Sequence, residues 1–112
     1  MENKTATAIV AQLRDRAEKA GFDATGRPFL AIQVTLKDLT EDNLFYIEIK
    51  DDKLTFEAAE YADRQANIIM TSENFMKMTN GELNSMLALT TGKLKIEGDI
   101  TKAKALKEIF KK

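Results

Sequence analysis

The sequence predicts an α+β fold in two layers, in which helices cover one face of a five-stranded sheet. Two observations carry this prediction. Five segments alternate apolar and polar residues with a period of two, which is typical of strands that bury one face. Other segments place apolar residues at helical spacing. A sheet with one apolar face needs its helices on that face, so the order α-β-β-β-β-α-α-β-α predicts a two-layer domain.

The N-terminal half begins with a helix and continues as three strands. Residues 6–20 repeat apolar side chains at positions i, i+3, i+4 and i+7, which predicts a helix. Alternation predicts strands at 29–37, 44–50 and 54–60. A tight turn at 51–53 joins the last two, so we expect an antiparallel meander with one solvated face.

The C-terminal half mixes short helices and strands, and turn residues separate them. The expected elements are a strand at 66–72, a helix capped by Thr71 or Ser72 that stops at 79–81, a helix at 82–89, a strand at 93–97, and a helix capped by Asp99 or Thr101 that ends at Phe110. Their lengths fit a single domain over residues 1–112.

The composition excludes several kinds of function. The chain has no His and no Cys, which excludes disulfides, zinc sites built from those residues and the commonest general base at neutral pH. Its net charge is −1, so no basic field for nucleic acid is expected. No apolar run approaches the length of a membrane span, and the charged N-terminus argues against a secretory signal. We therefore expect a cytoplasmic protein.

The candidate motifs for chemistry are weak. Gly92-Lys93 suggests a phosphate loop, but Leu87 stands where that loop needs a glycine, and Leu94 stands where it needs Ser or Thr. The paired carboxylates at 41–42 and 51–52 fall in turns, where solvated acids are common. The sequence therefore predicts no catalytic residue, no metal site and no cofactor.

Four methionines, Met70, Met76, Met78 and Met86, lie close together in the C-terminal half. Methionine is flexible and polarisable, so it fills irregular gaps in a core and also lines surfaces that accept ligands of varying shape. Both interpretations remain open from the sequence. The second one indicates an apolar ligand.

A family resemblance is carried by residues 66–110. Its features are the strand start Ala66-Asn67, then Phe75, Gly81, the apolar pair Met86 and Leu89, the run Gly92-Lys93-Leu94-Lys95-Ile96, Gly98-Asp99, and an Ala- and Leu-containing helix that ends at Phe110. The N-terminal half matches in element order and in the hairpin FYIEIKDDKLTF. Together these features resemble the sterol carrier protein lipid-transfer domain family. The resemblance implies a mixed sheet and an apolar tunnel between the two layers, which accepts fatty acyl chains, acyl-CoA, phospholipids or sterols.

The expected function is therefore non-enzymatic binding and transfer of a hydrophobic lipid. The expected lining comes from inward sheet positions (Ile32, Val34, Phe45, Ile47, Phe56, Ile68, Met70, Ile96) and from the helices (Phe75, Met78, Leu83, Met86, Leu89, Phe110). The alternative is a structural or accessory module of the same fold with a filled core, which acts through a partner protein or as a homodimer. The carrier itself is expected to be a monomer or a homodimer.

Membrane contact has one candidate. Lys104, Lys107 and Lys111 form a stripe on the last expected helix, beside an apolar arc that contains Leu106 and Phe110. A basic edge beside an apolar arc can settle a helix on an anionic membrane. Lysines are also favoured at a helix C-terminus for reasons unrelated to membranes. The stripe therefore predicts either transient membrane contact or a simply solvated edge.

Overall fold

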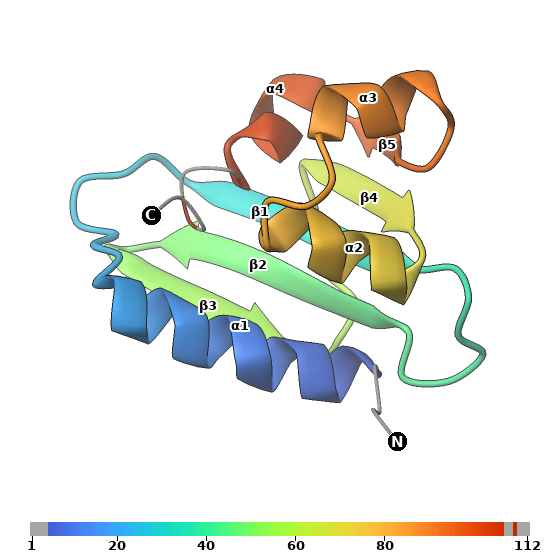
Figure 1. The fold of residues 1–112 in the computed structure, drawn as a ribbon. Coiled ribbons are helices and arrows are strands. Elements are labelled where there is room, and N and C mark those ends of the chain that lie inside the picture. The colour runs from blue at the N-terminus through green and yellow to red at the C-terminus, as the bar shows by residue number, and fades with distance from the viewer. Residues whose placement is uncertain (1–4, 107–108, 110–112) are drawn as a thin grey trace.

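The computed structural model describes residues 5–106 and residue 109, and it has the predicted order of elements (Figure 1). The elements are α1 (Ala6–Ala20), β1 (Leu30–Leu36), β2 (Leu44–Lys50), β3 (Lys53–Glu57), β4 (Ala66–Met70), α2 (Ser72–Thr79), α3 (Ser85–Thr90), β5 (Lys95–Gly98) and α4 (Ile100–Lys104). The predicted α+β class is confirmed. Helix α1 begins and ends as its sequence predicts, because Thr5 caps its start and Gly21, at φ 69°, ends it.

The five strands form one mixed sheet in the order β3-β2-β1-β4-β5. Strands β1, β2 and β3 make the expected antiparallel meander. Strand β4 then pairs in parallel with β1, so that Val34 lies beside Ile68, and β5 pairs antiparallel with β4. The mixed sheet that the family resemblance implied is therefore confirmed.

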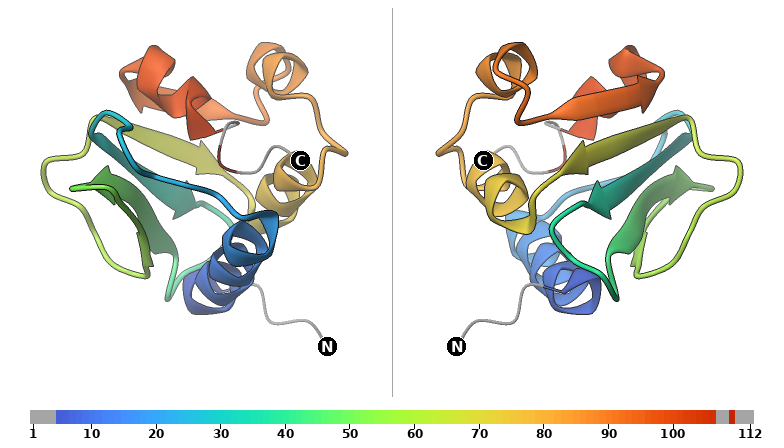
Figure 2. Two further views of the ribbon diagram at one scale, coloured as in Figure 1. Left: turned by 90° about the vertical axis from the view of Figure 1, so that its left-hand side faces the viewer. Right: turned by 90° about the vertical axis from the view of Figure 1, so that its right-hand side faces the viewer.

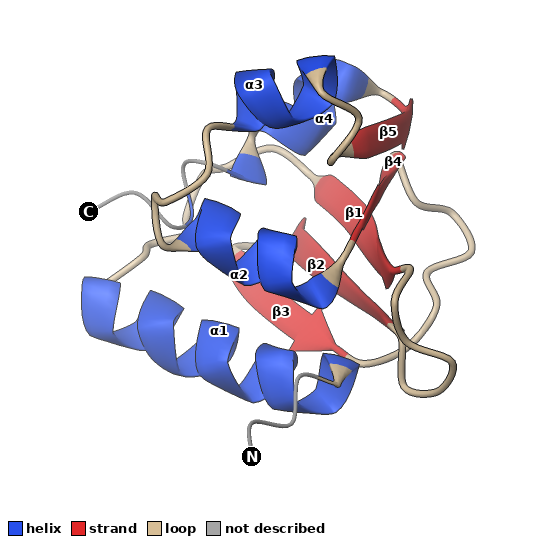
Figure 3. Cartoon of the chain, turned by 45° about the vertical axis from the view of Figure 1, so that its right-hand side comes forward, coloured by secondary structure: helices blue, strands red, loops and turns tan. Residues whose placement is uncertain are grey.

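The helices and the sheet enclose the core. Helix α1 packs against β2 and β3, and its Ile9 and Leu13 are fully buried. Helix α2 is held by Phe75, whose ring meets that of Phe45 on β2 edge-on at 5.3 Å. Helix α4 packs against β4, β1 and β5. Figure 3 shows α1 and α2 lying across the front of the strands.

The alternation predicted that the opposite face of the sheet is solvated. In the structure, part of that face is covered by the chain. Residues 58–65 cross that side, away from the helices (Figure 2). The Tyr61 backbone N–H donates to the side chain of Gln33, which is only 3% exposed. The Tyr61 hydroxyl donates to Glu48 at 2.8 Å, and this bond raises the pKa of Tyr61 to about 12 because it favours the protonated phenol. Residues 58–60, which the alternation placed in a strand, belong to this crossing segment, and β3 ends at Glu57.

Two C-terminal boundaries also differ from the sequence prediction. Helix α3 begins at Ser85 rather than near residue 82, because the Asn84 side chain accepts hydrogen bonds from the next turn and so caps the helix. Strand β5 begins at Lys95 rather than at residue 93. Helix α4 is capped by Asp99, and its expected continuation to Phe110 includes residues outside the described part of the chain.

Short strands form the two edges of the sheet. Strand β5 has four residues, and its Lys95 and Glu97 are exposed. Strand β3 has five residues, and the Arg14 guanidinium of α1 donates to the carbonyl oxygen of Phe56 on this strand at 2.6 Å. Helix α1 is thereby tied to the β3 edge by a polar contact as well as by its apolar face.

Candidate functional site

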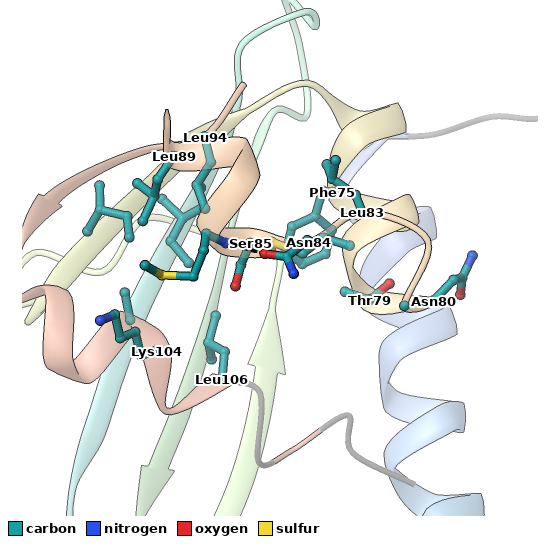
Figure 4. Close-up of a pocket in the computed structure, with 16 residues that line it drawn as sticks. Phe75, Thr79, Asn80, Leu83, Asn84, Ser85, Leu89, Leu94, Lys104 and Leu106 are labelled. Atoms are coloured by element: carbon teal, nitrogen blue, oxygen red, sulfur yellow. Dashed lines mark hydrogen bonds between the residues drawn. The ribbon is translucent and has the colours of Figure 1, made fainter. Parts of the chain in front are cut away.

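A pocket of about 650 Å³ lies between the β4–β5 side of the sheet and helices α2, α3 and α4 (Figure 4). Its volume is within the usual range of small-molecule sites. Ten of its sixteen lining residues are apolar: Ile68, Phe75, Met78, Leu83, Met86, Leu89, Leu94, Ile96, Ala103 and Leu106. The other six are Thr79, Asn80, Gly81, Asn84, Ser85 and Lys104. A mostly apolar surface with a few polar groups suits a ligand that is itself mostly apolar.

The chain leaves α2 through a tight turn and then passes along the pocket. Gly81 has a φ of 81°, which the left-handed turn after α2 requires and which glycine adopts at little cost. Asn84 then starts α3 as its cap. In Figure 4, Thr79 and Asn80 lie at one end of the pocket, and Leu89 and Leu94 lie at the other. The α2–α3 connection therefore forms one wall.

Half of the predicted lining residues meet at this pocket. They are Ile68, Phe75, Met78, Leu83, Met86, Leu89 and Ile96. Six others do not line the pocket and are buried in the core, each at most 2% exposed: Ile32, Val34, Phe45, Ile47, Phe56 and Met70. Phe110 lies outside the described residues. Direct contact of any of these side chains with a ligand stays a prediction.

The arrangement of the helices explains why some of the predicted residues line the pocket and others do not. Helix α1 covers β2 and β3, and α2 is fixed to β2 through Phe75, so the inward side chains there have helix side chains against them. Over β4 and β5 the helical layer is made of two short helices, α3 and α4. Short helices cover less of the sheet, and the pocket lies under them.

Sequence reasoning missed nine lining residues. The sequence pattern could have identified three of them, because Leu94 falls in the expected strand at 93–97 and Ala103 and Leu106 are apolar positions of the last expected helix. No pattern identifies the residues at 79–81 and 84–85 as lining residues. They line the pocket only because the α2–α3 connection turns back over it, which no local pattern encodes.

Lys104 is the one charged side chain among the sixteen lining residues, and it is exposed at the rim. Among the described residues, no carboxylate forms an ion pair with it. Its two expected companions in a basic stripe, Lys107 and Lys111, lie outside the described part of the chain. The lining has no His, Cys, Asp or Glu, and no cluster of three or more such residues in the described chain could hold a metal ion. This arrangement can bind a ligand, but it offers no paired acid and base.

Arg16 of α1 holds the wall of the pocket from outside. One of its nitrogens donates to the Thr79 carbonyl oxygen at 3.0 Å, and another donates to the Asn80 side-chain oxygen at 2.5 Å. Both acceptors belong to residues that line the pocket. Hydrogen bonds from a charged donor are stronger than neutral ones. Arg16 therefore fixes the position of the turn where α2 ends.

Replacing Arg16 with glutamine should loosen this turn without unfolding the domain. A hydrogen bond contributes about 1 kcal/mol net, so amide exchange at Glu82 and Leu83 should accelerate by about fivefold. Both amides donate to the Lys77 carbonyl oxygen and report on the turn. The matched control is Arg14→Gln on the same helix, whose guanidinium contacts Phe56 on β3 instead. Equal acceleration in both variants would mean that Arg16 has no special hold on the pocket wall.

The fold and the site together define a class: a small two-layer α+β domain with a ligand pocket between its layers and no acid–base pair in the pocket lining. The model of the SCP-2 sterol transfer family matches residues 10–111. The chain therefore belongs to this family. No curated protein sequence matched the chain. Among the described residues, no helix is long and apolar enough to cross a bilayer.

Solved structures share the fold over nearly the whole chain. The solution structure of sterol carrier protein-2 from Aedes aegypti in complex with palmitate aligns with a TM-score of 0.65 and 16% identity, and covers 99% of this chain and 97% of that one. Sterol carrier protein-2 like-3 from Aedes aegypti aligns with a TM-score of 0.65 and 20% identity, and covers 89% and 94%. Identities this low show a common fold.

The same fold also occurs inside a larger protein. The sec-alkylsulfatase Pisa1 from Pseudomonas sp. aligns with a TM-score of 0.61 and 18% identity over 73% of this chain. The aligned part is only 12% of the sulfatase, so the present chain corresponds to a small portion of that enzyme.

Proposed function

We propose that this protein binds a lipid with a long acyl chain in the pocket and carries it without changing it chemically. The observation that supports this most directly is the pocket itself, with ten apolar residues among its sixteen. A methylene group gains about 0.8 kcal/mol on leaving water, so an acyl chain would supply most of the binding free energy. The palmitate-bound relative has the same fold, which makes a fatty acid the first ligand to test.

The proposal includes an absence of catalysis. The chain has no His and no Cys, and the pocket lining has no carboxylate that could act as a base. Acyl-CoA, phospholipid and sterol-like molecules remain alternative ligands of the same pocket. We propose a cytoplasmic carrier that needs no cofactor, no metal and no nucleic acid, and that meets anionic membranes only transiently.

The experiment compares two adjacent residues of α3. Met86 is 56% exposed and lines the pocket, whereas Leu87 is 57% exposed and does not. Met86→Trp should fill the pocket mouth and weaken binding of a fluorescent fatty acid by about tenfold, given the ~1–3 kcal/mol that overfilling a packed space costs. Leu87→Trp should bind like the parent. Because both positions are exposed, both variants should keep the melting temperature of the parent.

A second function is favoured by one observation, the likeness to a small part of the sulfatase. In that case the chain would be an accessory module that works through a partner or as a homodimer. Native mass spectrometry of protein purified from cells separates the two, because a carrier should retain lipid. A parent protein that retains no lipid and binds no fluorescent fatty acid would favour the accessory module.

A further inference from the structure

Exposed apolar side chains gather on the two short helices above the pocket. The described part of the chain exposes four large apolar residues, and three of them are Met86, Leu87 and Ile100 of α3 and α4, between 47% and 57% exposed. The fourth, Phe29, lies just before β1. Figures 1 and 3 both show α3 and α4 together at one end of the molecule. Single exposed apolar residues are ordinary, but a group of them at one end indicates a contact surface.

This surface is continuous with the mouth of the pocket. Met86 contributes to both, since it lines the pocket and is more than half exposed. Lys104 of α4 lines the same pocket and is also exposed. A surface that binds over α3 and α4 therefore also lies over the mouth of the pocket, where Met86 is exposed.

The described segment that contains α3 and α4 carries a net positive charge. Residues 85–106 contain four lysines and two acids, whereas residues 5–84 contain nine basic and fourteen acidic residues. The net charges of these two segments are therefore +2 and −5. Lys93 follows α3, and Lys102 and Lys104 belong to α4. Lysines beside an apolar patch are what attracts a helix to an anionic bilayer.

We propose that α3 and the start of α4 form a membrane-docking face, defined by Met86, Leu87 and Ile100 with Lys93, Lys102 and Lys104 beside them. When this face lies on an anionic lipid surface, the mouth of the pocket lies against the lipid. This inference builds on the proposed function, because docking there lets a lipid move between bilayer and pocket without crossing water. A protein partner fits less well, because protein interfaces are depleted in lysine, whereas three lysines lie beside this patch.

The test measures binding of ligand-free protein to vesicles of phosphatidylcholine with phosphatidylserine, and to vesicles of phosphatidylcholine alone. The parent should bind the anionic vesicles more strongly, and added salt should remove the difference. Leu87→Ser should weaken binding to the anionic vesicles by about fivefold or more, because one inserted leucine is lost. The matched control is Phe29→Ser, which removes an exposed apolar residue from elsewhere and should bind like the parent. Lys93→Gln with Lys102→Gln should remove most of the preference for anionic vesicles.

Two measurements separate this inference from the proposed function. Fatty-acid binding in solution needs no vesicle, and Leu87→Ser should retain it because Leu87 does not line the pocket. Fatty-acid binding with no preference for anionic vesicles would overturn the docking face alone. Equal losses of vesicle binding for Leu87→Ser and Phe29→Ser would overturn the docking face too. A change in oligomeric state caused by Leu87→Ser would also overturn it. Vesicle binding through Leu87 without fatty-acid binding would support the docking face and overturn the lipid carrier.

Discussion

Replacing Phe75 with alanine is expected to lower the free energy of unfolding by about 3–5 kcal/mol, a large part of the ~5–15 kcal/mol typical of a domain. Phe75 is fully buried, and its ring lies edge-on to that of Phe45 at 5.3 Å. The alanine would leave a hole between α2 and β2 that the surrounding backbone cannot close. Urea unfolding followed by circular dichroism measures the loss.

The control for this variant is Phe29→Ala. Phe29 is 42% exposed, so its truncation removes much less buried surface and should change stability little. Because Phe75 also lines the pocket, its loss should join the new hole to the pocket and weaken fatty-acid binding as well. A stability loss no greater than that of Phe29→Ala would show that the Phe45–Phe75 contact does not hold α2 in place.

Gly98→Ala is expected to be the second most damaging change. Gly98 has a φ of 96°, and a Cβ built on it would lie 2.6 Å from the carbonyl oxygen of Gln65. That oxygen accepts a hydrogen bond from the Asp99 backbone N–H at 2.9 Å, so the backbone cannot move away without losing it. The left-handed conformation alone costs a non-glycine residue about 1–2 kcal/mol, and the steric clash should add to this cost.

Gly92→Ala provides the matched comparison for Gly98→Ala. Gly92 has a φ of 81°, but a Cβ there would meet nothing within 4 Å, so it should carry only the conformational cost. Thermal melts measure the stability of both variants, and the difference between their melting temperatures reports the cost of the close approach of β5 to Gln65. If both lose the same stability, the tight backbone contact is not important to the fold.

The sequence predicted best where a pattern is long and local. The helix over α1 and the strand β2 were placed correctly, because fifteen residues of helical spacing and seven residues of alternation leave little ambiguity. The parallel pairing of β1 with β4 has no local signature, and only the family resemblance implied a mixed sheet. The crossing of residues 58–65 over the far face was missed, because the apolar residues of that segment are three alanines and Tyr61, which follow no regular spacing.

The candidate site was half predictable, for a related reason. Alternation identifies the side chains that point toward the helices, and it identified Ile47 and Ile96 equally well. It does not tell where each helix crosses the sheet. Ile47 lies on β2 beneath packed helices and is completely buried, whereas Ile96 lies on β5 and lines the pocket. That distinction depends on the short helices α3 and α4, whose positions follow from contacts distant in sequence.

The short strands at the two edges of the sheet also bear on how molecules of this protein behave at high concentration. An open strand edge is a template on which another chain can extend a sheet, and long, flat, apolar edges are the most hazardous. Here β5 has only four residues, with exposed Lys95 and Glu97, and Arg14 crosses to the backbone of β3. A strand from a second molecule would find a short, charged edge on one side and a guanidinium on the other. The domain can therefore keep an open apolar pocket without offering a start for fibrous self-assembly.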